Sequence, residues 1–245
     1  MNSLRGAWRL GRAVAHAWVG LVTILFLFPK MSQPQREARV QSWSLEMLAV
    51  LGVRLELHGE PPAAGPVLLV ANHISWLDIL VMHAGRYCRF VSKADVRRWP
   101  LIGTLATGGG TIYIERGSRR DALRVVHHMA QSLGRGDVVA VFPEGTTSDG
   151  MTLLSFHGNL IQAAIAAGTP AQPVALRFVD PRTGGPSLTP CYTGDGTFVG
   201  SFWRTVSGDP VTAVIRYGQP QFQAGRDRRA WAADLRVAID ELRRL

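Results

Sequence analysis

The chain has 245 residues, of which 47% are hydrophobic and 18% are charged. This length and composition suit one compact domain with an accessory segment, and they exclude a globally disordered chain. Lysine and arginine outnumber aspartate and glutamate by 27 to 18, so the formal net charge is +9. Such an excess points to nucleic acid, an anionic membrane or a phosphate-bearing substrate. The two cysteines, Cys88 and Cys191, are isolated, which argues against a disulfide framework and favours a reducing compartment.

An uncharged apolar run, residues 13–29, follows Arg5, Arg9 and Arg12 near the N-terminus. No small-residue cleavage pattern follows it, so we interpret the run as a retained segment rather than a secretory signal. A spanning helix needs about 20 residues, and this run suits either a tilted span or a helix embedded in one leaflet. The three arginines favour the anionic cytoplasmic leaflet. We therefore expect the inner membrane, with the rest of the chain on the cytoplasmic face.

A second helical stretch is expected at about residues 35–51, where Trp43 suits a membrane interface. Two consecutive apolar helices joined near Pro34 predict a hairpin that lies on the membrane. The alternative is that both helices cover the core of the domain. We divide the chain into a membrane-anchoring helix pair, residues 1–52, and an α/β domain, residues 53–245.

From Leu55 onward, short apolar runs alternate with helical stretches. This alternation predicts an α/β fold with a mostly parallel central sheet flanked by helices. Helices are expected at Arg119–Leu133 and Arg228–Leu245, and a long loop is expected at Asp180–Trp203. The expected strands are Val67–Ala71, Arg89–Ser92, Thr111–Glu115, Val138–Phe142, Pro173–Phe178 and Ala213–Tyr217.

A histidine and an aspartate follow the first of these strands, in the sequence NHISWLD at residues 72–78. On one straight helix His73 and Asp78 would diverge by about 140°, so they meet only if the histidine lies in the turn before the helix. Asp78 could alternatively only complete a capping box with Ser75. A histidine beside a carboxylate at the carboxyl end of a strand fits a general base whose tautomer the carboxylate fixes.

The sequence offers this base no nucleophile of its own, since Gly-x-Ser-x-Gly is absent and no serine or cysteine occurs in a recognisable nucleophile context. The proton would then come from the substrate, as it does when a substrate hydroxyl attacks a bound acyl donor. Metal coordination is the competing use of His73, but no HExxH or similar ligand pair occurs. We therefore expect no metal site.

Basic residues concentrate between Arg86 and Arg124, where nine of them face three acidic residues. Within this segment Gly110 precedes an expected strand, and Arg116 follows it. Glycine permits close backbone approach, and an arginine at a strand end can clamp a phosphate. Lys93 also stands at a strand end. The alternative for most of these residues is a solvated basic face.

The fourth strand ends in the sequence FPEGTTS, residues 142–148. Glu144 can bind a substrate hydroxyl or an arginine, and the Gly145 amide could face a developing oxyanion. Thr146 is the first of three hydroxyl residues that follow. The alternative is an ordinary turn.

Together these segments resemble the glycerolipid acyltransferase family, in particular bacterial 1-acylglycerol-3-phosphate (lysophosphatidic acid) acyltransferases. The resemblance spans about residues 55–178. Residues 72–78 resemble the His-x4-Asp block of the family, and residues 172–176 resemble a weakened fourth block. The second and third blocks correspond to residues 110–116 and 142–148.

The resemblance implies that His73 deprotonates the acceptor hydroxyl and that Asp78 orients His73. The donor would be an acyl thioester of coenzyme A or acyl carrier protein, and no cofactor is implied because the thioester already carries the activated acyl group. Membrane lipids and a lysolipid acceptor are the other expected partners, and nucleic acid is not one, since no nucleic-acid-binding motif occurs. The residues expected to bind substrate are Lys93, Gly110, Arg116, Glu144, Gly145 and Thr146.

Two positions depart from the family pattern: Thr147 stands where arginine is frequent, and Leu176 stands where proline is frequent. The predicted function is a membrane-associated O-acyltransferase of phospholipid biosynthesis that converts 1-acylglycerol-3-phosphate to phosphatidic acid. The missing arginine keeps another acceptor open, such as a lyso-ornithine lipid. A thioesterase-type hydrolase and a non-catalytic membrane-binding protein are the remaining alternatives.

Overall fold

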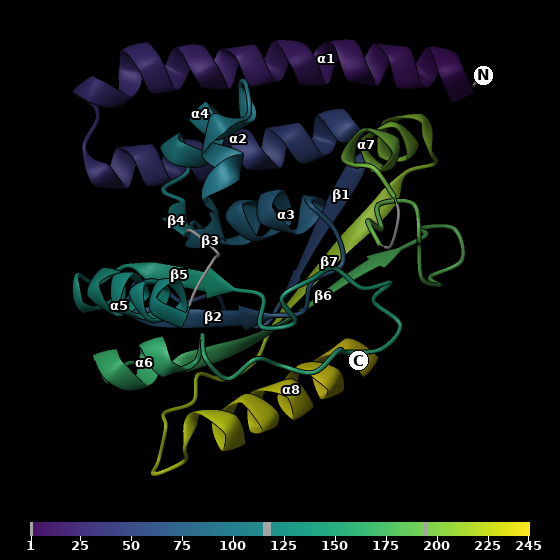
Figure 1. The fold of residues 1–245 in the computed structure, drawn as a ribbon. Helices are drawn as coiled ribbons and strands as arrows, with labels where there is room; N and C mark the ends of the chain where they lie inside the picture. Colours follow the sequence, from purple (N-terminus) through teal and green to yellow (C-terminus); the bar gives the residue numbers. More distant parts are fainter. Residues whose placement is uncertain (1, 115–118, 194–195) are drawn as a thin grey trace.

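The structure, a computed structural model, describes residues 2–114, 119–193 and 196–245 (Figure 1). Within these residues the chain forms a seven-stranded sheet in the order β1-β7-β6-β2-β5-β3-β4. Neighbouring strands are parallel apart from the antiparallel pair of β6 and β7, which confirms the predicted mostly parallel sheet. The strands are β1 (Val53–His58), β2 (Val67–Ala71), β3 (Arg89–Lys93), β4 (Ile112–Ile114), β5 (Val138–Val141), β6 (Ala171–Val179) and β7 (Val211–Tyr217).

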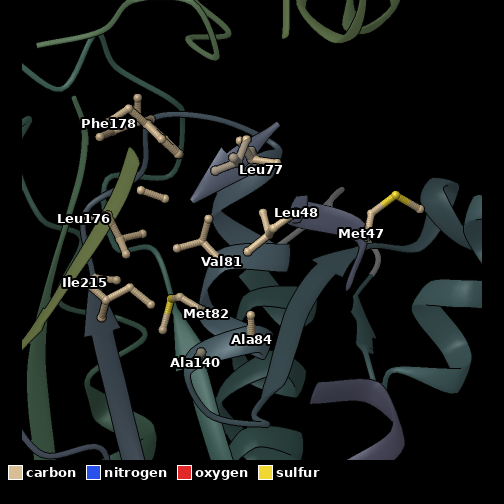
Figure 2. Close-up of a cluster of buried hydrophobic side chains, with 14 of the residues drawn as sticks. Met47, Leu48, Leu77, Val81, Met82, Ala84, Ala140, Leu176, Phe178 and Ile215 are labelled. Carbon is tan, nitrogen blue, oxygen red and sulfur yellow. The ribbon is translucent and has the colours of Figure 1, made fainter. Parts of the chain in front are cut away.

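Helices cover both faces of the sheet, so the sheet lies between two layers of helices (Figure 1). The face under α1, α2 and α3 carries one apolar core, part of which is shown in Figure 2, and the face under α5, α6 and α8 carries the other. Alternate residues of β2 enter opposite cores because successive strand residues point to opposite faces. The helices are α1 (Asn2–Val22), α2 (Gln33–Leu51), α3 (Leu77–Gly85), α4 (Ile102–Gly108), α5 (Arg119–Gly134), α6 (Gln162–Ala167), α7 (Phe198–Ser207) and α8 (Arg228–Arg244).

One strand and one loop differ from the sequence prediction. The strand β1 was not expected; its apolar residues alternate with Arg54, Glu56 and His58 because it is an edge strand that pairs only with β7. The expected loop 180–203 contains the beginning of α7, which Thr197 caps by accepting a hydrogen bond from the Gly200 amide at 3.0 Å.

The N-terminal helix is longer than the predicted apolar run. The three arginines lie inside α1 rather than before it, and the helix continues through a π turn at Thr23–Leu27 and a 3-10 turn at Phe28–Lys30. The helices α1 and α2 lie side by side (Figure 1). His16 and Trp43 join them, since the ring nitrogen of each lies 3.0 Å from the backbone carbonyl of the other.

The direction of the strands decides where chemistry can occur. Because β2, β3, β5 and β6 run parallel, the segments that follow them leave the sheet at one edge, where ligands bind in folds of this type. This edge, formed by the carboxyl ends of the strands, is called the catalytic edge. It carries His73, Lys93, the 142–148 segment and Arg177.

Candidate active site

The structure brings His73 and Asp78 together as predicted. The imidazole Nδ1 lies 2.7 Å from Asp78 Oδ2. The backbone amides of Ile74 and Ser75 donate to the same oxygen, at 2.6 and 2.9 Å. His73 occupies the turn after β2, and Asp78 occupies the first turn of α3, where its side chain is completely buried. Asp78 thus both caps the turn and contacts the imidazole.

This geometry sets the tautomer of His73. Because the ionised Asp78 oxygen can only accept, Nδ1 carries the proton and Nε2 keeps its lone pair. The ring also stacks on Phe142, with centroids 4.0 Å apart and planes 7° apart. Phe90 stacks in turn on Phe142 at 5.6 Å. With 19% of its side chain exposed, His73 is fixed in orientation yet open to a substrate, as a general base must be.

Glu144 binds the backbone of His73. Its side chain is buried, Oε1 accepts from the His73 amide at 2.7 Å, and Oε2 accepts from the Leu154 amide at 3.0 Å. Burial raises the pKa of Glu144, and the two backbone hydrogen bonds partly oppose that rise. Glu144 therefore holds the backbone of the site, and its contact with the acceptor stays a prediction.

The rest of the 142–148 segment completes this support. The Ser148 amide donates to the His73 carbonyl at 2.8 Å, so both backbone polar groups of His73 are held by one segment. The Thr147 hydroxyl donates to the Tyr192 carbonyl. The Gly145 amide donates to the Phe142 carbonyl at 3.1 Å. The Gly145 amide, which was predicted to face an oxyanion, is therefore already hydrogen-bonded within the turn.

Four predicted substrate-binding residues remain. Lys93 is exposed at the end of β3, on the edge that carries His73, and no ion-pair or hydrogen-bond partner meets its side chain within the described ranges. Thr146 is exposed in the turn beside Gly145. Arg116 lies outside the described residues. Gly110 is different and lies far from His73.

Gly110 lies at the amino end of β4, near the opposite edge of the sheet from His73. Its φ is +80°, and an added Cβ would lie 2.3 Å from the Tyr87 hydroxyl. Its carbonyl accepts from Arg89 Nε at 2.9 Å. These contacts give Gly110 a structural reason to be glycine, and they do not bring it to the catalytic edge.

Two arginines of α8 contribute to the site without any motif that marks them in the sequence. Arg236 donates to the carbonyls of Leu153 and Leu154 at 2.9 and 3.0 Å, and Arg243 donates to the carbonyls of Gly150 and Met151. The segment they hold includes Leu154, whose amide binds Glu144. A chain of hydrogen bonds therefore joins α8 to the backbone of His73.

The two cysteines do not offer an alternative nucleophile. Both are buried and free. Burial raises the pKa of Cys191 to about 11 and raises that of Cys88 further. Both thiols therefore stay protonated at neutral pH. Among the residues that the structure describes, no group of three or more histidine, cysteine or carboxylate side chains gathers as metal ligands would.

Comparison with known proteins identifies the family of this chain. The family model named Acyltransferase matches residues 54–177. A lyso-ornithine lipid O-acyltransferase of Pseudomonas aeruginosa is 36% identical over 96% of this chain and 89% of its own length. A 1-acyl-sn-glycerol-3-phosphate acyltransferase of Neisseria gonorrhoeae is 39% identical over 69% of this chain and 66% of its own. The crystal structure of the 1-acyl-sn-glycerophosphate acyltransferase of Thermotoga maritima matches with a TM-score of 0.70, at 18% identity, over 98% of this chain and 97% of the other.

The chain therefore belongs to the acyltransferase family, and it is an acyltransferase. The likeness to the Thermotoga enzyme shows the shared fold.

We predict that Arg236→Ala weakens catalysis through Glu144. Release of Leu153 and Leu154 weakens the Leu154 hydrogen bond, one of the contacts that lower the Glu144 pKa together with His73 and Arg243. The Glu144 pKa then rises further, so the carboxylate takes up a proton at a higher pH as the solution is acidified. We expect kcat to fall roughly tenfold, with the acid limb of its pH profile moved to higher pH.

Steady-state kinetics across pH measures both effects. Arg229→Ala is the matched control, because Arg229 is an exposed arginine of the same helix and its loss should change neither quantity. An Arg236→Ala enzyme with unchanged kcat and an unmoved acid limb would contradict the role given to α8.

Proposed function

We propose that the protein transfers an acyl chain from a thioester donor to the free hydroxyl of a lysolipid. The observation that carries this proposal is the His73 imidazole, with Nδ1 bound to Asp78 and Nε2 available to a substrate. No serine or cysteine nucleophile accompanies this base among the described contacts. A base of this kind activates a hydroxyl that the substrate brings.

The reaction follows from that geometry. Nε2 of His73 takes the proton of the acceptor hydroxyl as its oxygen attacks the thioester carbonyl. Asp78 remains ionised and stabilises the imidazolium that forms. The tetrahedral intermediate then expels the thiolate, which receives the proton from His73. A new ester bond replaces the carbon–sulfur bond, and the base returns to its starting state.

The donor is an acyl group carried on coenzyme A or on acyl carrier protein. Because a thioester is already activated, the reaction needs no metal ion or organic cofactor. The acceptor is a lysolipid, which the names of the relatives support: lyso-ornithine lipid for the Pseudomonas enzyme and 1-acyl-sn-glycerol-3-phosphate for the Neisseria enzyme. Transfer to 1-acylglycerol-3-phosphate would give phosphatidic acid.

The surface of α1 supports association with a membrane. The helix turns small residues, among them Gly6, Ala13 and Gly20, toward the domain. Large apolar side chains face outward, with Trp8 exposed to 68% and Trp18 to 56%. A surface of this kind is normally buried by a partner or a lipid phase. The described helix Ser3–Lys30 is long and apolar enough to cross a membrane.

The contacts of α1 favour a helix that lies in one leaflet. Arg5 and Arg9 donate to the carbonyl groups at the end of α7, at 3.2 to 3.3 Å. His16 and Trp43 bind α1 to α2 further along. A spanning helix would have to break these contacts. The engaged arginines leave Arg12 as the exposed one of the three.

We place the protein at the inner membrane, with residues 1–52 as the anchor and the catalytic domain on the cytoplasmic face. Two lines of support are the anionic lipids of that leaflet, which attract basic residues such as Arg12, and the two free thiols, which suit a reducing compartment.

The reaction is tested by offering purified protein a panel of lysolipids with acyl-CoA and acyl-carrier-protein donors. We expect free thiol to appear with a matching lysolipid, one acylated lipid forming for each thiol released. His73→Ala should abolish this transfer, because no other described side chain replaces Nε2. Thiol and fatty acid released without any lysolipid would identify a hydrolase instead. Wild-type transfer by the His73→Ala enzyme would contradict the mechanism.

The anchor is tested by replacing Trp8 and Trp18 together with serine. Burial of one large apolar side chain contributes about 1.5–3 kcal/mol, so the double variant should bind vesicles at least about tenfold more weakly. Sedimentation with vesicles measures this binding, and Leu123→Ser, an exposed apolar residue of α5 on the opposite layer, is the control. Equal binding by all three proteins would exclude α1 as the membrane surface.

A further inference from the structure

A small open cavity of about 180 Å³ lies at the catalytic edge of the sheet, and the proposed mechanism does not use it. Ile74, the residue after His73, forms part of its wall. Arg177 enters from the end of β6, and Asp149 enters from the segment after the 142–148 turn. The volume suits a polar headgroup and is far smaller than a cofactor pocket.

Arg177 is the unengaged cation of this cavity. Its side chain is half-buried, yet no hydrogen bond or ion pair reaches it within the described part of the chain. Arg243, the second arginine of the lining, is already occupied by Asp240 at 3.1 Å and by two backbone carbonyls. A half-buried guanidinium without a partner is suited to bind the carboxylate or phosphate of a ligand.

Asp149 adds a negative charge to the same cavity. Its Oδ1 accepts from the Met151 amide at 2.9 Å, while Oδ2 has no hydrogen-bond partner among the described residues. A ligand in this cavity therefore meets one cation and one anion. A phosphate group gains from Arg177 and is repelled by Asp149, whereas a headgroup with both charges gains from each.

The residue at position 147 also argues against a phosphate headgroup. Arginine is frequent at this position in the family pattern, but here the hydroxyl of Thr147 is bound to the Tyr192 carbonyl. The 142–148 segment thus supplies no positive charge to a phosphate. Within the cavity lining, Arg177 is the cation that no described hydrogen bond or ion pair engages.

The arrangement of the helices around the sheet is consistent with a headgroup bound in this cavity. The apolar surface of α1 and the helix α8 lie on opposite sides of the sheet (Figure 1). The cavity is lined by Arg243 of α8 and also by Ile74 and Phe178 of the core under α3, so it lies at the end of the sheet between the two helix layers. A lysolipid whose hydroxyl reaches His73 could therefore place its headgroup in this cavity while its chain stays on the side of α1.

We propose that this cavity binds an amino-acid headgroup of the acceptor, with its carboxylate on Arg177 and its ammonium group on Asp149. An amide-linked ornithine carries these two groups. The inference rests on the proposed function and narrows its acceptor: a zwitterionic amino-acid lysolipid is preferred to a phosphomonoester such as 1-acylglycerol-3-phosphate.

The test compares lyso-ornithine lipid with 1-acylglycerol-3-phosphate as acceptors for the full-length protein, with one acyl donor. Wild-type enzyme should have the higher kcat/KM with lyso-ornithine lipid. Arg177→Ala should raise the KM for that acceptor about tenfold to a hundredfold and leave kcat nearly unchanged, and Arg177→Lys should restore part of the loss. Neither change removes a hydrogen bond or ion pair of the described residues.

Asp149→Asn provides a readout of opposite sign for the two acceptors. The amide oxygen of asparagine can still accept from Met151, so the turn is kept. Its KM should rise for lyso-ornithine lipid and fall for 1-acylglycerol-3-phosphate, because the repulsion of the phosphate is removed. Arg229→Ala is the control for loss of a positive charge.

The outcomes separate this inference from the proposed function. A wild-type preference for the phosphomonoester would overturn the inference. Variants that change the KM for both acceptors equally, or that change neither KM, would also overturn it. If the protein transfers acyl groups neither to these two acceptors nor to any other lysolipid, the proposed function itself is overturned.

Discussion

One carboxylate oxygen organises the catalytic edge. Asp78 Oδ2 accepts from the imidazole of His73 and from the amides of Ile74 and Ser75. A fully buried carboxylate loses several kcal/mol of hydration, and these three donors offset that loss at Oδ2, whereas Oδ1 has no hydrogen-bond partner among the described residues. Because two donors belong to the turn and one to the base, the turn cannot relax without moving the imidazole. The same interaction that begins α3 therefore also fixes the tautomer of His73 and aims its Nε2.

The backbone of His73 is held as firmly as its ring. Glu144 accepts from the His73 amide, and Ser148 donates to the His73 carbonyl. These hydrogen bonds explain why a segment 70 residues further along the chain belongs to the same site: it fixes the position of the turn. Buried networks of this kind are rigid when every member is paired, and α8 extends the network through Arg236. Precise placement of one base is what a reaction without an enzyme nucleophile requires.

Sequence patterns predicted the parts of this protein that depend on local order. The apolar runs of β2 and β5 are buried on both faces, and the five-residue spacing of His73 and Asp78 fits a turn that enters a helix. Contacts that depend on the folded chain could not be predicted this way. The backbone partners of Glu144 and Gly145, which are distant amides for the first and a nearby carbonyl for the second, are contacts of this kind. The Thr197 cap of α7, and the arginines of α8 that hold the 150–154 segment, likewise carry no periodic signal.

The central claim is that Asp78 holds the proton of His73 on Nδ1 and leaves Nε2 as the base. Nitrogen-15 NMR of the histidine side chains in detergent micelles tests it directly, with the His73 signals assigned by their loss in His73→Ala. In the neutral imidazole we expect the proton on Nδ1 and a bare Nε2. In Asp78→Ala this preference for Nδ1 should be lost, because the carboxylate oxygen that accepts its proton is removed. A wild-type His73 that carries its proton on Nε2 would contradict the account.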